Sequence, residues 1–304
     1  MKEQRAQTLI LVALMLTVLL GFVALSLDGG NAYLQRRRMQ NAADAGALAA
    51  ARAKCMGTPA DYLAYGKALC ESQDNGGASC ALAATADGAR AVASITVGTW
   101  FARVLGINIL TVSAAATGAC SSSLGTGNLL PITLPNTGFG PGKFYTIWDK
   151  DEGDQGSYGW LRWENPECGK NLPDWVSSPA CAPFLVIPVT INTKTGVDNA
   201  AFDTLWSTWM CKSVTVPIYD TSKWQSLPGN NNAYPIIGFA QFKVTAMCGP
   251  GNPGSLVCPG SGSPVPSCSK SERAVTGQFV TYVVDPNSKP GGPDYGVYRV
   301  YLTD

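Results

Sequence analysis

Residues 8–27 read TLILVALMLTVLLGFVALSL, twenty residues without a charged side chain. As an α-helix rising 1.5 Å per residue, this stretch would span about 30 Å, the thickness of the hydrocarbon core of a bilayer. Three interpretations compete: a cleaved signal peptide, a buried helix of a large soluble core, and a retained helix in a membrane or filament core. A signal peptide usually has an apolar region of only about 7–15 residues, and no other part of the chain is apolar enough to surround a buried helix. The retained helix, Thr8–Leu27, is therefore favoured.

The helix is expected to continue beyond Asp28, because residues 31–54 (NAYLQRRRMQNAADAGALAAARAK) consist mainly of strong helix formers. Gly29 and Gly30 leave room for a kink. Small side chains then recur every four residues, which lets another helix approach closely. This Ala-rich stem either rests on its own domain or packs against another subunit. The two rows are Ala42, Gly46 and Ala50, and Ala43, Ala47 and Ala51.

Composition excludes several classes of function. The 304 residues contain no histidine, which removes Ser-His-Asp and Cys-His nucleophile systems and histidine metal ligands. The formal charge of +1 offers no basic footprint for nucleic acid, so no such partner is expected. Only 14% of residues are charged, against roughly 25% in an average soluble protein. With 33 Gly and 20 Pro, this composition indicates an extracytoplasmic β-rich protein.

The pattern beyond the stem predicts an α+β fold in three further parts. Residues 55–120 form a small α/β element, with a helix beginning at Pro59 and strands at 90–97 and 109–116. Residues 121–128 (SSSLGTGN) are the expected linker. Residues 129–304 are expected to form an antiparallel β-sandwich or barrel with one helix at 197–210. The expected strands there lie at 129–134, 143–149, 159–163, 184–191, 213–219, 236–246, 275–284 and 297–302.

Ten cysteines without a C-x-x-C motif predict five disulfides rather than a zinc or redox site. Four precede the linker and six follow it, so each half can pair internally. Cys55–Cys70 and Cys168–Cys181 are the pairs suggested by proximity in sequence. Disulfides require an oxidising compartment, whereas Arg36-Arg37-Arg38 would favour the cytoplasm under the positive-inside rule. The cysteines decide for export. They are Cys55, Cys70, Cys80, Cys120, Cys168, Cys181, Cys211, Cys248, Cys258 and Cys268.

Sites for chemistry are few. Asp149, Asp151 and Asp154 could supply oxygen ligands to Ca²⁺, but the EF-hand spacing is not met and a solvated hairpin tip is favoured. Carboxylates near tryptophans could also serve glycoside hydrolysis, which the sequence only weakly indicates. No enzyme activity and no cofactor are expected. A second hypothesis is a surface adhesin or carbohydrate-binding module that stacks sugars on tryptophans. The candidates are Trp160, Trp163, Trp175 and Trp224.

The N-terminal segment resembles the TadG-like proteins of the Tad (Flp) pilus system. The shared pattern is an apolar helix ending in Asp-x-Gly, then a tyrosine, paired basic residues and Gln-Asn-Ala-Ala-Asp-Ala. The segment FARVLG…TVSAAAT extends the resemblance to about residue 120. Flp pilins carry a glutamate shortly after their cleavage point, but this chain has none between Glu3 and Glu71. The matching positions include Asp28, Tyr33, Arg36, Arg37, Gln40, Asn41, Ala42 and Asp44.

The resemblance implies a non-enzymatic, single-pass membrane protein with its C-terminal domain outside the cytoplasm. Such a protein would assist pilus assembly, or enter a surface filament as a pilin-like subunit. Its partners would be pilus-system proteins or copies of itself, contacted through the N-terminal helix, together with the membrane around Thr8–Leu27.

Overall fold

The computed structural model divides the chain into two compact units. Unit 1 comprises Met1–Cys120 and Val300–Asp304, and unit 2 comprises Ser121–Arg299. The structure describes residues 3–72, 76–137, 139–148, 159–163, 168–169, 171–194, 199–223, 225–226, 232–249, 252–269, 272–283 and 288–303.

Unit 1 is built along one uninterrupted helix, α1 (Glu3–Met56). The apolar stretch and the Ala-rich stem are therefore a single element, and helical backbone runs through Gly29 and Gly30. Gly57 follows with φ of +66°, the left-handed conformation that commonly ends a helix. The predicted continuation of the helix beyond Asp28 is confirmed.

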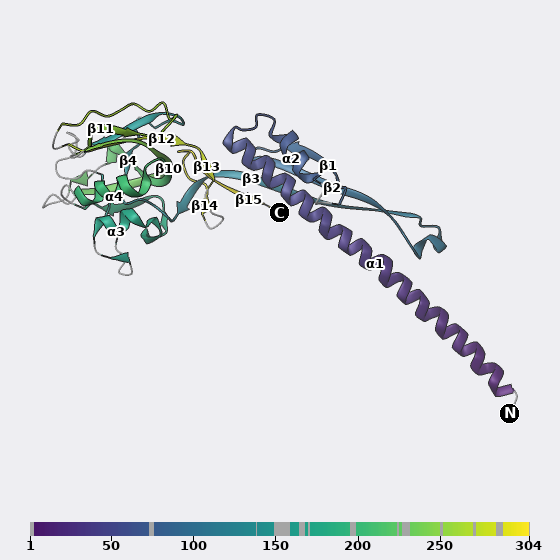
Figure 1. Ribbon diagram of the computed structural model, residues 1–304. Helices are drawn as coiled ribbons and strands as arrows, with labels where there is room; N and C mark the ends of the chain where they lie inside the picture. Colours follow the sequence, from purple (N-terminus) through teal and green to yellow (C-terminus); the bar gives the residue numbers. More distant parts are fainter. Residues whose placement is uncertain are drawn as a thin grey trace. The chain divides into compact units, whose positions relative to one another are not determined.

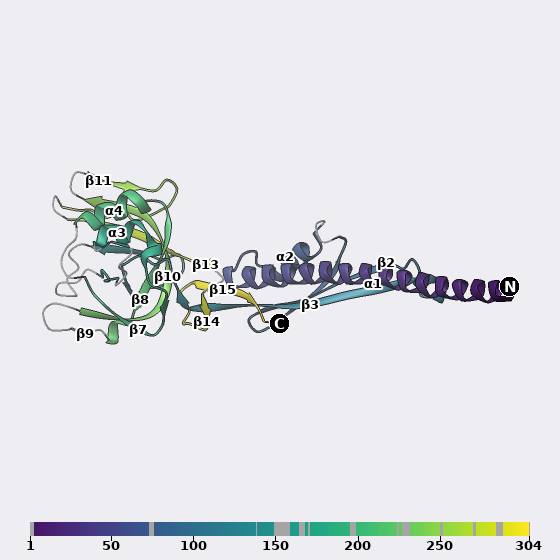
Figure 2. The same cartoon turned by 90° about the horizontal axis from the view of Figure 1, so that it is seen from below.

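A short helix and an antiparallel sheet cover the stem (Figures 1 and 2). Helix α2 (Tyr62–Cys70) begins after Asp61, whose carboxylate accepts a hydrogen bond from Ala64 N at 2.9 Å. The expected start at Pro59 is wrong by a few residues, because this aspartate supplies the N-cap. The strands are β1 (Ser79–Ala84), β2 (Gly88–Gly98) and β3 (Ile109–Thr126), with the 3-10 turn η2 (Ala102–Leu105) between β2 and β3.

Strand β3 runs further than the sequence predicts. It pairs with β2 from Ile109 to Ala119 and continues to Thr126. The segment 121–128, expected to be a linker, is therefore extended strand over most of its length. Its glycine- and serine-rich composition does not prevent pairing, because β14 (Lys289–Pro290) and β6 (Leu185–Val186) bond to it. Ser123 and Thr126 are buried there.

Unit 2 is centred on one long strand, β10 (Asn232–Gly249). Its neighbours run antiparallel to it, β8 (Ser213–Tyr219) on one side and β12 (Ala274–Val280) on the other. The sheet order is β4-β8-β10-β12-β5, and β7, β9 and β11 also pair with β10. The remaining elements are β4 (Leu134–Pro135), β5 (Phe144–Trp148), β7 (Val189–Asn192), β9 (Gln225–Ser226), β11 (Asn252–Val257), β13 (Tyr282–Val283), β15 (Val297–Leu302), α3 (Leu172–Ser177), α4 (Asn199–Trp209), η4 (Pro179–Cys181) and η5 (Thr221–Lys223).

The α+β class, with a long helix and a disulfide-rich β part, is confirmed. Segments 213–219 and 297–302 are strands within the predicted bounds, and the helix predicted at 197–210 is α4. Segments 129–134 and 159–163 contribute mainly isolated bridges, such as Ile132 to Trp160 and Leu161 to Thr193. Helix α3 was not predicted, since its six residues are too few to carry a helical period.

Candidate functional site

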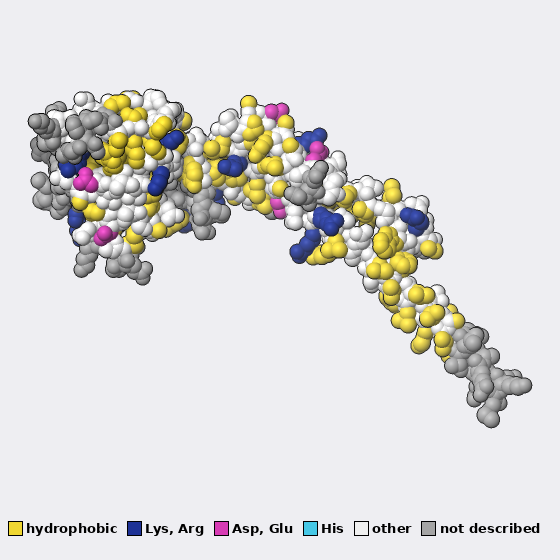
Figure 3. All heavy atoms as spheres, viewed as in Figure 1, with side chains coloured by type: hydrophobic (Ala, Val, Ile, Leu, Met, Phe, Trp, Pro, Cys, Tyr) yellow, Lys and Arg dark blue, Asp and Glu magenta, His cyan; other side chains and the backbone are white. Residues whose placement is uncertain are grey.

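The first part of α1 exposes its apolar side chains on every face. From Leu11 to Leu27 the side chains carry no charge, and Met15 and Leu25 are 70% and 72% exposed. The most apolar window of this helix has a mean hydropathy of 2.3, and none of it is buried. Figure 3 shows hydrophobic side chains gathered along this half of the helix. Exposure on this scale is costly in water, whereas a bilayer or an apolar protein partner would cover it.

Asp28 ends the apolar stretch and ties α1 to the turn between β2 and β3. Its Oδ1 accepts a hydrogen bond from Trp100 N at 2.9 Å, and its Oδ2 accepts from Phe101 N at 3.0 Å and Ala102 N at 2.7 Å. These bonds favour the ionised carboxylate, so they lower the pKa of Asp28, with the Trp100 and Ala102 amides contributing most. The predicted stem residue Asp28 is thus a fixed internal contact of unit 1.

The basic residues of the family pattern remain in solvent. Arg36, Arg37 and Arg38 are all exposed. Arg37 Nε donates to the Tyr33 hydroxyl at 3.1 Å, and its guanidinium carbon lies 5.5 Å from the centroid of that ring. Exposed pairs of this kind contribute little to folding. The three guanidinium groups remain available to anionic partners or lipid headgroups.

Gln40 connects the next turn of α1 to the sheet. Its Nε2 donates to Asp44 Oδ1 at 2.8 Å and to Ala115 O of β3 at 3.4 Å. Asn41, which follows it, is exposed. The Gln-Asn-Ala-Ala-Asp pattern therefore alternates between residues that fix the stem to its own sheet and residues that face solvent.

The small-residue rows are occupied by the chain's own elements. Ala42 and Ala50 are completely buried. A Cβ added at Gly46 would lie 2.7 Å from Cys70 Cβ, and one added at Gly66 would lie 2.6 Å from Gly46 O, so α1 and α2 cross at two glycines. Of the two interpretations of the stem, these contacts support packing on its own domain, because a second subunit cannot reach the buried rows.

Five disulfides form, two within unit 1 and three within unit 2, and no cysteine is free. Each half of the chain pairs internally, as expected, and the predicted Cys168–Cys181 bond is confirmed. The suggested Cys55–Cys70 bond is wrong. Cys55, in the last turn of α1, is bonded to Cys120 of β3, and Cys70, at the end of α2, is bonded to Cys80 of β1. The pairs are Cys55–Cys120, Cys70–Cys80, Cys168–Cys181, Cys211–Cys258 and Cys248–Cys268.

The residues considered for sugar or metal binding divide into two groups. Trp160, Trp163 and Trp175 are only 0%, 2% and 4% exposed and belong to the core of unit 2, so they cannot stack on a glycan. That part of the carbohydrate-binding hypothesis is wrong. The other candidates, Trp224, Asp149, Asp151 and Asp154, lie outside the described residues. Within the described ranges, no cluster of three or more His, Cys, Asp or Glu side chains could hold a metal.

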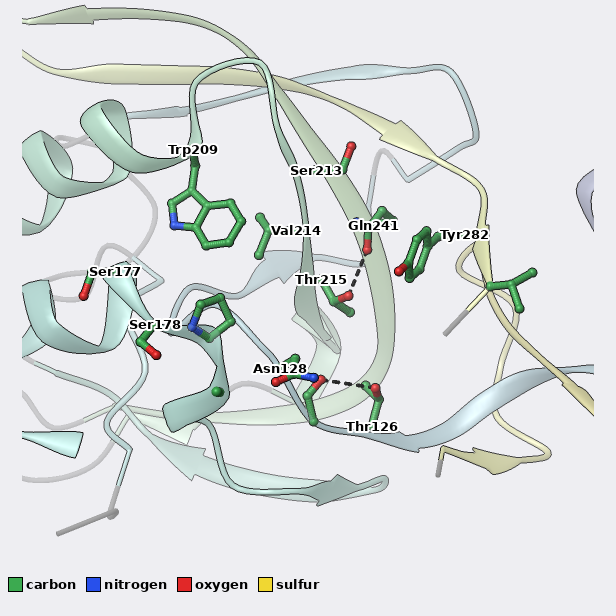
Figure 4. Close-up of a pocket in the computed structure, with 14 residues that line it drawn as sticks. Thr126, Asn128, Ser177, Ser178, Trp209, Ser213, Val214, Thr215, Gln241 and Tyr282 are labelled. Carbon is green, nitrogen blue, oxygen red and sulfur yellow. Dashed lines mark hydrogen bonds between the residues drawn. The ribbon is translucent and has the colours of Figure 1, made fainter. Parts of the chain in front are cut away.

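Unit 2 also carries an open cleft of about 660 Å³ beside β8 (Figure 4). At its base, Thr215 Oγ1 donates to Gln241 Oε1 at 2.8 Å, and both side chains are buried. The polar groups that line it are hydroxyls, amides, a phenol and an indole, and none of the described residues around it is Asp, Glu, Lys or Arg. Its polar and aromatic lining comprises Thr126, Asn128, Ser177, Ser178, Trp209, Ser213, Thr215, Gln241 and Tyr282.

The described residues thus have the architecture of a membrane-type protein: an apolar helix near the N-terminus is joined to an α+β part with five disulfides. Among the described residues, α1 is the one helix long and apolar enough to cross a membrane.

Residues 6–53 match the model of the Flp pilus-assembly TadE/G-like family, which confirms the resemblance over the apolar helix and the stem. Neither the comparison with curated proteins nor that with solved structures finds a match. The family match and the membrane-type helix together indicate a pilus-associated membrane protein.

Proposed function

We propose that this chain is a non-enzymatic, membrane-anchored component of a Tad/Flp-type pilus system. One observation carries the proposal: the matched family segment, residues 6–53, contains the helix whose apolar side chains are exposed on all faces. The Thr8–Leu27 stretch anchors the chain, and everything beyond Asp28 is exported. Export is supported by the five disulfides, which persist in oxidising compartments and are rare in the cytosol.

The stem in this proposal is a rigid support for the exported units. The alanine and glycine rows of the stem are buried against other elements of unit 1. The Cys55–Cys120 bond fixes the C-terminal end of the stem to β3. Contacts with pilus-system partners therefore fall to the exposed apolar segment and to the exposed residues of the next two turns, such as Leu34. A pilin-like role would use the same surface for copies of this chain.

Anchoring is tested by fractionation of two leucine variants. Leu19 is 62% exposed on the apolar stretch, and Leu256 is 41% exposed on β11. Leu19→Arg should shift the chain out of the carbonate-resistant membrane fraction, since a charge at the centre of a span costs about 2.5–3.5 kcal/mol on insertion scales. Leu256→Arg should leave fractionation unchanged. A wild-type chain found soluble in the cytoplasm with reactive thiols would overturn the proposal.

The place of the chain in the pilus is tested by electron microscopy of surface appendages with and without the gene. If the chain is an assembly component, filaments should disappear or shorten when the gene is absent, and filaments purified from cells that have the gene should contain little of this chain. Filaments in which this chain is the main band would replace that role with the pilin-like one. Appendages that are unchanged without the gene would contradict both the assembly role and the pilin-like role.

A further inference from the structure

The turn between β2 and β3 presents an apolar surface that the fold leaves uncovered. Residues 99–110 read TWFARVLGINIL, with one ionisable side chain among twelve residues. Trp100, Val104 and Ile109 are 75%, 87% and 65% exposed, and Phe101 and Ile107 are exposed as well. We call residues 99–110 the hairpin tip. Large apolar side chains gathered in this way mark a surface that contacts a partner or a membrane.

The hairpin tip is held beside the apolar segment of α1. Asp28 accepts hydrogen bonds from three consecutive amides of the tip, Trp100 to Ala102. On the N-terminal side of this attachment, Phe101 and Val104 share a groove of about 580 Å³ with helix residues from Thr17 onward. The exposed side chains of the tip thus adjoin the last turns of the exposed apolar helix, as the hydrophobic surface in Figure 3 shows. The two surfaces are continuous within unit 1.

Many backbone amides of the hairpin tip have hydrogen-bond acceptors, as a low-dielectric surrounding requires. Besides the three amides bound by Asp28, Thr99 N donates to Asn108 O at 3.1 Å and Val104 N to Phe101 O at 3.0 Å. Gly106 N and Ile107 N donate within the same turn, to Arg103 O and Ala102 O. Unpaired backbone groups are what excludes irregular loops from lipid. By accepting hydrogen bonds from three of these amides, Asp28 lowers the cost of placing the tip in lipid.

The side chains of the tip and their position beside the apolar helix fit the lipid–water boundary. Tryptophan is enriched at that boundary, and the tip has its tryptophan at the level of Asp28, where the apolar helix ends. Arg103 points its guanidinium back toward the strand, since a Cβ added at Gly98 would lie 3.8 Å from Arg103 Nη2. A cation held back from an apolar turn can reach anionic headgroups while the turn enters the acyl boundary.

We propose that the hairpin tip is a second membrane contact, lying in the outer interface of the bilayer beside the α1 anchor. The proposal rests on the anchoring proposed above and adds a constraint to it. A helix alone leaves the exported part free to rotate about the anchor. Two contacts on one rigid unit fix which face of unit 1 is turned toward the membrane.

The test uses the full chain with its disulfides intact, reconstituted in vesicles of phosphatidylcholine and phosphatidylglycerol. Trp100 is the single tryptophan in residues 1–120, so the difference between wild type and Trp100→Phe isolates its emission. Phosphatidylcholines brominated near the headgroup should quench this component strongly, and those brominated near the bilayer centre should quench it weakly. Flotation of the same samples on a density gradient reports anchoring separately.

Two valine variants provide the matched comparison. Val104→Glu in the tip should lower the quenching of Trp100 by half or more, whereas Val265→Glu, also at an exposed valine but in unit 2, should not change it. A chain that floats with vesicles while its Trp100 emission is unquenched overturns the tip proposal and leaves the anchor intact. A Trp100 emission that is unquenched but shifts with protein concentration would assign the tip to a second copy instead. A chain that does not float overturns both proposals.

Discussion

A methyl group added at Gly46 probes the crossing of α1 and α2. In Gly46→Ala the new Cβ would lie 2.7 Å from Cys70 Cβ and 3.1 Å from Gly66 O, whereas ordinary contact begins at 3.4 Å. Cys70 cannot turn aside, because it is completely buried and bonded to Cys80. The two helices must therefore separate by about 0.7 Å at this point, the shortfall against ordinary contact at close packing.

The expected cost follows from two opposing effects. Overpacking of a well-packed core costs about 1–3 kcal/mol. Replacing glycine by alanine inside a helix returns about 0.5–1 kcal/mol through lower backbone entropy in the unfolded chain. Gly46→Ala should thus lower the free energy of unfolding of unit 1 by up to about 2.5 kcal/mol, with a central value of about 1 kcal/mol. Gly30→Ala is the matched control in the same helix, since a Cβ there meets nothing within 4 Å. It should stabilise the helix by about 0.5–1 kcal/mol.

Guanidinium unfolding of the full chain in detergent, without reductant and followed by far-UV circular dichroism, measures both variants. Hydrogen exchange of the peptide covering 62–70 then localises the effect to α2. The midpoint should fall for Gly46→Ala and rise or stay level for Gly30→Ala. Equal midpoints for the two variants, or unchanged exchange in α2, would refute the close crossing of the helices.

Three further outcomes follow from the described contacts. Replacing Cys168 and Cys181 together by serine opens a short loop and should cost unit 2 about 3 kcal/mol, measured by thermal unfolding, without changing exchange in unit 1. Trp160→Ala should cost about 3–5 kcal/mol in the same assay, since the side chain is completely buried, and a surface role in sugar binding would instead leave stability unchanged. Asp28→Asn should raise acrylamide quenching of Trp100 by weakening the three amide bonds. Because those bonds lower the pKa of Asp28 below its ordinary 3.8, their contribution is full above that value and is lost as pH falls through the lower folded pKa. Quenching of the wild type should therefore stay constant from about pH 7 to about pH 5 and rise only in stronger acid.

The elements readable from sequence are those decided by local pattern. The uncharged run before Asp28 and the helix formers after it specify α1 without reference to any other part of the chain. Strands β8 and β15 alternate between clear turn signals, so their bounds agree with prediction. Disulfide pairing within each unit is also predictable, because an even number of cysteines lies on each side of Ser121, four before it and six after it.

The errors arise where a distant segment decides the structure. Residues 121–126 have turn composition, but β14, more than 160 residues later, pairs with them and makes them strand. The tryptophans near Leu161 lie beside carboxylates in the sequence, which is typical of a sugar site. In the structure Trp160 packs edge-to-face on Phe202 of α4, and Trp163 is buried in the same core. Local composition carries no information about such partners.

Asp28 and the stem illustrate the same limit at the candidate site. The family pattern singles out Asp28, but its three partners lie 72–74 residues away and bind through backbone amides, so their residue types do not predict the contact. Likewise, a row of small residues predicts that a helix or sheet will approach closely, without saying whose. In this chain Gly66 of α2 and Gly118 of β3, where an added Cβ would lie 2.3 Å from Ala47 O, fill that role. Since those rows are closed within unit 1, they are not open to a helix from another protein, and the apolar side chains that α1 leaves exposed lie N-terminal to them, between Leu11 and Leu34.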